Sequence, residues 1–169
     1  MMSHLLVATE IQVPPSQLFT YVSSLWESGE VLGPSHSRAP APSSGRMGTG
    51  FRLPCPAGRW AVPADTTLVV TDFREPHGWR ASSESEERLC WEIHIQPTAD
   101  GSLLVCGLCH LPKGAWHRLR DIVLDTPRRR RALEDLLTRW KEDAERRQAL
   151  DRLRLAARGG EADSSEVTG

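Results

Sequence analysis

The sequence predicts an α+β fold in which a curved antiparallel β-sheet wraps around one long C-terminal helix. Three observations lead to this expectation. Residues 88–96 (RLCWEIHIQ) alternate between apolar and polar side chains, which is the period of a strand with one buried face. Residues 97–101 (PTADG) are typical of a hairpin turn into another strand-like segment. Apolar residues between 116 and 144 recur at steps of three and four, the spacing of an amphipathic helix.

The first elements are a strand and two short helices. Residues 4–13 (HLLVATEIQV) are partly alternating and rich in β-branched side chains, and the following prolines end this strand. Ser16 is the expected N-cap of a helix. The helical spacing is carried by Leu18, Phe19, Val22 and Trp26. It is broken near Ser23 and ends within 29–33, which favours two short helices over one long helix.

The middle of the chain reads as a loop followed by strands. Residues 34–50 are rich in proline, serine and glycine and lack an apolar period, so they predict a loop that is a candidate lid. Strand-like patterns follow at residues 50–55, 66–73, 79–84, 88–96 and 102–111.

The C-terminal helix carries its apolar stripe on Leu133, Leu136, Leu137, Trp140 and Ala144. Pro127 predicts a kink or a break beside it. Beyond Ala144 the stripe thins, and the helix is expected to continue with solvated charge pairs. From Gly159 onward the composition predicts disorder. We therefore expect a single domain over residues 1–158 and a disordered tail over 159–169.

Composition limits the function classes. With 21 lysines and arginines against 22 acidic residues, the net charge of −1 gives no global attraction to nucleic acid. The first residues lack the basic and apolar regions of an export signal, which predicts a cytoplasmic protein with reduced thiols. No apolar run approaches the length of a membrane span. The basic run at 128–131 (RRRR) is expected to be a solvated helix start, although it could contact an acidic carrier protein or a phosphate.

This order of elements resembles the START-like, helix-grip superfamily, also called SRPBCC, and within it the polyketide cyclase/dehydrase-like branch. The resemblance covers roughly residues 5–146. It is carried by ATEIQVPPSQLFTYV, GRMGTGFRL before the second strand, VVTDFREPHGWR, HIQPTADGSLL, and LPKGAW before ALEDLLTRWKEDAE. These are patterns of residue types, and their shared order is the informative feature.

The resemblance implies a deep apolar cavity between the sheet and the long helix that holds a polyketide-, lipid-, sterol- or isoprenoid-like molecule. Members of this superfamily include both carriers and enzymes, so three functions stay open. The protein binds such a ligand, or it is a cyclase/dehydrase-type enzyme using the same cavity, or it is an interaction module acting through its charged C-terminal helix. No cofactor and no metal site are predicted, and the protein is expected to be a monomer or a homodimer.

One short motif suggests haem or metal binding, but strand geometry excludes both. Residues 106–110 (CGLCH) match the attachment motif of a c-type haem. In a strand, however, Cys106 and Cys109 lie about 10 Å apart and point to opposite faces, so they cannot share one haem. Cys106 and His110 share a face but stand about 13 Å apart, too far to bind the same zinc ion.

The same alternation assigns the candidate site. If the hairpin register follows the family pattern that the resemblance implies, the inward face of residues 102–110 holds Ser102, Leu104, Cys106, Leu108 and His110. A register shifted by one residue would turn His110 outward and place Cys109 inward. The predicted ligand-binding residues are Trp26, Trp60, Trp79, Trp91, Ile93, Ile95, Leu104, Cys106, Leu108, His110, Leu133, Leu137 and Trp140. Packing alone would also explain the tryptophans, and Trp116 is a further candidate for the wall. The candidate proton-transfer or oxyanion residues are His110, Arg52 and Tyr21.

Overall fold

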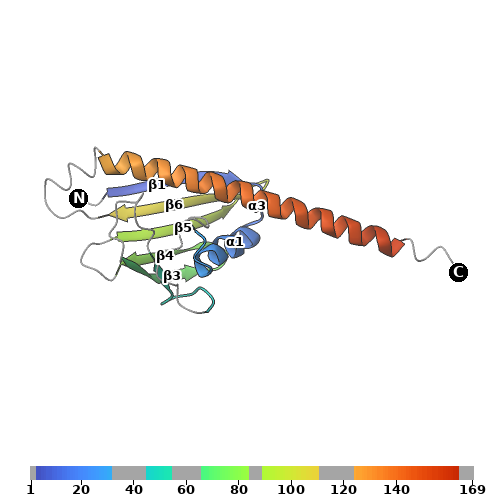
Figure 1. Cartoon of the computed structure of the whole chain (residues 1–169), viewed down its shortest axis with the longest axis horizontal. Coiled ribbons are helices and arrows are strands. Elements are labelled where there is room, and N and C mark those ends of the chain that lie inside the picture. Colours follow the sequence, from blue (N-terminus) through green and yellow to red (C-terminus); the bar gives the residue numbers. More distant parts are fainter. Residues whose placement is uncertain (1–2, 32–44, 55–65, 84–88, 111–123, 164–169) are drawn as a thin grey trace.

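A six-stranded antiparallel sheet and two helices make up the part of the chain that the computed structural model describes, which is residues 3–31, 45–54, 66–83, 89–110 and 124–163 (Figure 1). The elements are β1 (Ser3–Ile11), α1 (Pro15–Glu27), β2 (Arg52–Pro54), β3 (Thr67–Arg74), β4 (Gly78–Ser83), β5 (Leu89–Pro97), β6 (Ser102–His110) and α3 (Thr126–Asp163). The strand order is β1-β6-β5-β4-β3-β2, and each neighbouring pair is antiparallel. The predicted α+β fold with its long C-terminal helix is therefore confirmed.

The register of the central hairpin is the predicted one. Trp91 lies opposite Leu108, and Ile93 lies opposite Cys106. Directly opposed residues of an antiparallel pair point to the same face of the sheet, so these side chains share one face. All four are 2 % exposed or less, which identifies this face as the inner one. His110 lies opposite Leu89 on that same face.

Helix α3 lies along β1 at one edge of the sheet and extends well past the strands (Figure 1). Its buried stripe is the predicted one, with Leu133, Leu136, Leu137, Trp140 and Ala144 all at 4 % exposure or less. Pro127 lies in the first turn, where a missing amide N–H costs no helical hydrogen bond. The helix boundary thus falls beside Pro127, while the expected helical residues 116–123 and the tail 164–169 lie outside the described residues. Helical backbone continues past Gly159 to Asp163.

Helix α1 corrects two expectations from the sequence. It begins at Pro15 with Pro14 as its N-cap, so Ser16 is not the cap. It also runs without a break through Ser23, which is buried at 7 % exposure. Ser23 lies between Val22 and Leu25 on the face that packs on the core, and its small side chain fits there without interrupting the helix.

Candidate functional site

The predicted ligand-binding residues meet in one buried cluster between the inner face of the sheet, α1 and α3. Those with 5 % exposure or less are Trp26, Trp79, Trp91, Ile93, Ile95, Leu104, Cys106, Leu108, Leu133, Leu137 and Trp140. Trp60 and Trp116 fall outside the described residues. Strand alternation and helical spacing thus predicted correctly that these side chains are buried, because both periods follow from backbone geometry.

Three tryptophans form the centre of this cluster. The Trp26 ring stands edge-on to the rings of Trp79 and Trp91, with 5.3 Å between centroids in each pair. Trp26 comes from α1, and the other two come from β4 and β5. The indole N–H groups of Trp26 and Trp79 are buried and have no acceptor among the described residues. Because buried N–H groups in folded proteins nearly always have a partner, these two donors mark a place where an acceptor is expected.

The inner wall ends in polar side chains. His110 is half-buried at the end of β6, and the start of α3 lies at the same end of the sheet (Figure 1). Asp125, directly before α3, and Arg129, in the first turns of α3, lie there and are 8 % and 3 % exposed. The sequence interpretation took Arg129 as part of a solvated basic run, and for this residue it was wrong. Arg129 stands four residues before Leu133 on the same buried stripe, and that spacing is the signal that could have found it.

The CGLCH segment has the geometry that its alternation predicts. It lies in β6, with Cys106 on the inner face and Cys109 on the outer face. Burial raises the pKa of the Cys106 thiol far above its ordinary range. The thiol therefore stays protonated near neutral pH and serves as an apolar part of the wall, not as a nucleophile.

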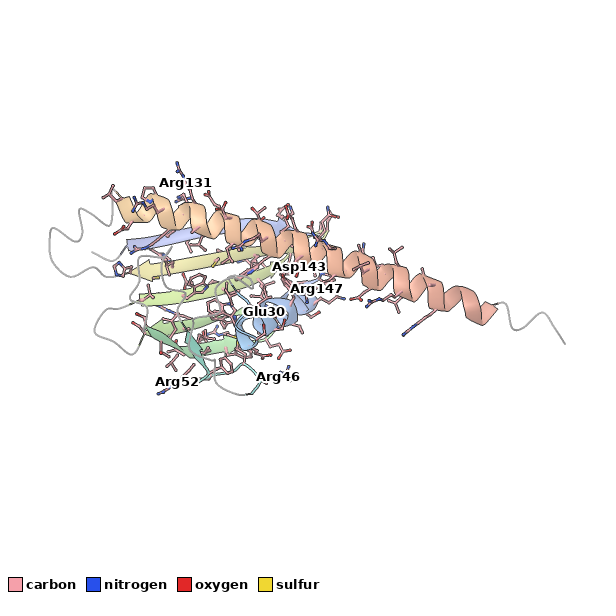
Figure 2. The ribbon with its side chains drawn as sticks, in the orientation of Figure 1. Glu30, Arg46, Arg52, Arg131, Asp143 and Arg147 are labelled. Atoms are coloured by element: carbon pink, nitrogen blue, oxygen red, sulfur yellow. The ribbon has the colours of Figure 1, made fainter. Side chains whose placement is uncertain are left out.

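Arg52 does not reach the inner wall. It is exposed on β2, between the buried residues Phe51 and Leu53 (Figure 2). The alternation of the strand forces this outcome, since neighbouring side chains point to opposite faces. Arg52 therefore does not point inward, where it could bind a ligand's carboxylate or stabilise an oxyanion, as the sequence had suggested.

Tyr21 also lies away from His110. Its hydroxyl donates a hydrogen bond of 2.9 Å to the carboxylate of Asp143 on α3. The guanidinium of Arg147 lies 5.0 Å from the centre of the Tyr21 ring and forms an ion pair of 3.0 Å with Asp143. Burial and the hydrogen bond to Asp143 raise the pKa of Tyr21, so the phenol is neutral at ordinary pH. Tyr21 fastens α1 to α3 in this structure.

A groove of about 870 Å³ lies at this junction, between the outer side of α1 and the projecting part of α3. Its α1 side is polar, with Ser16, Gln17, Thr20 and Ser24. Its α3 side carries four arginines, Arg147, Arg152, Arg154 and Arg158, beside one acidic residue, Asp151. The sequence interpretation missed this groove, because nothing in the sequence shows that α1 packs beside this part of α3.

Comparison with known proteins places the fold. No protein-family model matches the sequence, and no curated protein is similar to it. Solved structures do match in three dimensions. The KanY protein, solved by NMR, superposes with a TM-score of 0.64 over 86 % of this chain and 99 % of its own, at 15 % identity. A norcoclaurine synthase point mutant from Thalictrum, in complex with a transition-state analogue, superposes with a TM-score of 0.61. The match covers 88 % of this chain and 97 % of the synthase, at 12 % identity.

A Polyketide_cyc-like protein from Corynebacterium glutamicum gives a TM-score of 0.50 over 88 % of this chain and 92 % of its own, at 18 % identity. Among the described residues, no helix has the length and apolar character needed to cross a membrane. In each case the match extends over most of both chains. The chain therefore has the same α+β helix-grip fold as these structures.

Proposed function

We propose that the protein binds a hydrophobic small molecule, polyketide-, lipid- or isoprenoid-like, between the inner face of the sheet and α3. The observation that carries this proposal is the pair of buried indole N–H groups on Trp26 and Trp79, which lack an acceptor among the described residues. A carbonyl or hydroxyl oxygen on an otherwise apolar ligand would accept from them. The flat faces of the tryptophans favour a ligand with rings or conjugated double bonds.

The polar end of the wall supports a ligand with two chemically different ends. His110, Asp125 and Arg129 lie at the end of the sheet where α3 begins, whereas the tryptophans and leucines supply the apolar part of the wall. Such a site would bind an apolar body beside the tryptophans and a polar head near Arg129. We assign this function to a cytoplasmic protein, in keeping with Cys90, Cys106 and Cys109 being free thiols.

Ligand binding is tested on the full chain in two steps. Native mass spectrometry of the purified protein should detect a co-purified small molecule at one per chain. The fluorescent fatty acid cis-parinaric acid then serves as a defined probe, because its emission is excited by energy transfer from nearby tryptophans. Binding should saturate at one site. A folded protein that carries no small molecule and shows no saturable probe binding would contradict the proposal.

Matched tryptophan variants locate the site. Trp79→Phe keeps an aromatic ring but removes the N–H donor, and it should weaken probe binding about three- to tenfold, the value of one hydrogen bond. Trp140→Phe is the control. It also removes a buried indole, but the Trp140 nitrogen is not one of the buried donors that lack an acceptor among the described residues, so no unpaired donor is lost. Equal weakening by both substitutions would assign the effect to packing instead of to the donor.

The enzyme alternative, a cyclase/dehydrase-type activity in the same cavity, depends on His110. This residue is on the inner wall, whereas Arg52 and Tyr21 are not near it. A co-purified ligand whose mass changes on incubation with the protein, and no longer changes with His110→Ala, would favour the enzyme. A ligand of unchanged mass would favour the carrier.

The groove between α1 and α3 favours a second candidate function, an interaction module for an acidic partner segment. The groove is lined by four arginines and one acidic residue, so its lining carries a net positive charge. Arg152 and Arg158 line it from the projecting part of α3. Fluorescence anisotropy of a labelled acidic peptide is the test. Arg152→Glu with Arg158→Glu should abolish binding, whereas Arg131→Glu, at the other end of α3 (Figure 2), should not. Equal binding by all three proteins would overturn this candidate.

A further inference from the structure

The outer face of the sheet, on the side away from α1 and α3, brings together three side chains that are typical metal ligands. They come from three strands, with His4 on β1, Cys109 on β6 and Glu92 on β5. His4 lies directly opposite Cys109, and Glu92 lies opposite Gly107. His4 is far from the other two residues in the sequence, and the strand order β1-β6-β5 makes all three neighbours.

The donor atoms converge. Nε2 of His4 lies 2.7 Å from Oε1 of Glu92, and all three donor atoms lie within 4.8 Å of one another. Donors in a tetrahedral zinc site stand about 3.5 Å apart, given metal–ligand distances of about 2.0–2.3 Å. Small rotations of the side chains would therefore bring the imidazole, carboxylate and thiolate onto one ion.

Gly107 makes this convergence possible. A Cβ atom at this position would lie 2.5 Å from Cγ and from Oε1 of Glu92, so a side chain there would collide with the glutamate. Without one, Glu92 extends over β6 and reaches His4 on the far side of that strand. The glycine inside CGLCH thus gives the carboxylate its path, a role unrelated to haem.

Neighbouring side chains support the cluster. Nε2 of His94 lies 3.7 Å from Oε2 of Glu92, on the oxygen that does not contact His4. Cys90 lies opposite Cys109, and its sulfur is 3.7 Å from a guanidinium nitrogen of Arg80. Such contacts orient ligands from outside the coordination sphere. Exposure is graded, since the side chains of His4 and Glu92 are 46 % and 14 % exposed and Cys109 is 5 % exposed. An ion can therefore enter from the His4 side.

We propose that His4, Glu92 and Cys109 form a binding site for a divalent transition-metal ion of the zinc class, with a fourth position open to water or an incoming ligand. One nitrogen, one oxygen and one sulfur donor suit Zn²⁺ and the chemically similar Co²⁺, and they suit Mg²⁺ and Ca²⁺ poorly because those ions prefer oxygen. This site is on the opposite face of the sheet from the proposed cavity and does not depend on it.

Cobalt binding to the full chain tests the site. The protein carries Cys55→Ser to remove the thiol that lies outside the described residues, and a reductant without thiol groups keeps the others reduced. Titration with Co²⁺ should produce a near-ultraviolet thiolate-to-cobalt charge-transfer band that saturates at one equivalent, and added Zn²⁺ should abolish it. Cys109→Ser should remove the band. His4→Ala and Glu92→Gln should each weaken Co²⁺ binding at least tenfold.

Two controls separate this site from general metal affinity. Cys106→Ala removes a thiol on the same strand but on the inner face, and His77→Gln removes an exposed imidazole in the turn between β3 and β4. Both should keep the band and the affinity. The proposal is overturned if the folded protein gives no band, or if Cys109→Ser keeps it. Should Cys109→Ser fail to fold, His4→Ala decides, because the half-exposed His4 side chain can be removed without opening the core: unchanged affinity there also overturns the proposal.

Discussion

The hydroxyl of Tyr21 on α1 donates a 2.9 Å hydrogen bond to the carboxylate of Asp143 on α3. Arg147, which Figure 2 shows near Asp143 on α3, completes the contact by pairing with Asp143. Its guanidinium lies 5.0 Å from the centre of the Tyr21 ring. This group joins two helices through residues that are 122 positions apart in the sequence. It lies at the rim of the groove and holds α1 against the helix that closes the inner wall.

Removing the Tyr21 hydroxyl should loosen this junction. Tyr21→Phe keeps the ring under Arg147 and deletes only the hydrogen bond, so the free energy of unfolding should fall by about 1 kcal/mol at pH 7. Urea denaturation followed by circular dichroism measures the change. Thr20→Val, on the exposed side of the same helix, is the control and should change stability by less than about 0.5 kcal/mol. A Tyr21→Phe protein as stable as the parent would show that the bond contributes nothing.

The same phenol predicts a loss of stability at alkaline pH. Its pKa is raised in the folded protein by burial and by Asp143, whereas in the unfolded chain it is about 10. Above pH 10 the unfolded state therefore loses this proton while the folded state keeps it, and the free energy of unfolding falls as pH rises. Below pH 10 both states hold the proton and this contribution is constant.

Other groups ionise in this range too, so the difference between proteins is the informative quantity. Between pH 9 and 11, the free energy of unfolding of the parent should fall more steeply than that of Tyr21→Phe, measured by urea denaturation in steps of half a pH unit. Parallel curves would mean that the phenol has an ordinary pKa in the folded state.

Two leucines of α3 should differ sharply when truncated. Leu133 is fully buried against the sheet, whereas Leu153 is 68 % exposed on the projecting part of the helix. Leu133→Ala should cost about 2–5 kcal/mol of stability, and Leu153→Ala should change it by less than about 0.5 kcal/mol. Because both substitutions change helix propensity equally, thermal and urea denaturation report burial alone. Similar losses at both positions would place the projecting helix against a partner.

Gly107→Ala tests the path of Glu92 across β6. The added methyl group collides with the glutamate side chain, so the substitution should cost about 1–3 kcal/mol of stability. In a Glu92→Ala background the colliding atoms are gone, and the same substitution should cost much less. A double-mutant cycle by urea denaturation gives the coupling between the two positions. Additive costs would show that the collision is not the cause.

Local patterns accounted for the faces of the elements but not for every boundary. The alternation at residues 88–96 and 102–110 placed Trp91, Ile93 and Cys106 inward, and the structure confirms all three. The break expected at Ser23 was wrong, because a buried serine is indistinguishable by sequence from one that ends a helix. Arg129 was missed because it lies in a run of arginines, which is typical of an exposed surface, although it belongs to the buried stripe of α3.

The sequence by itself determined the periods of the strands and of α3, hence which side chains face inward and why Cys106 and Cys109 point apart. These follow from the geometry of each backbone element alone. The tertiary structure decided which elements lie side by side. It placed Tyr21 against Asp143 instead of near His110, and it brought His4 beside Glu92 across β6. Such contacts depend on strand order and helix packing, which are set by burial of the whole core and leave no local trace in the chain.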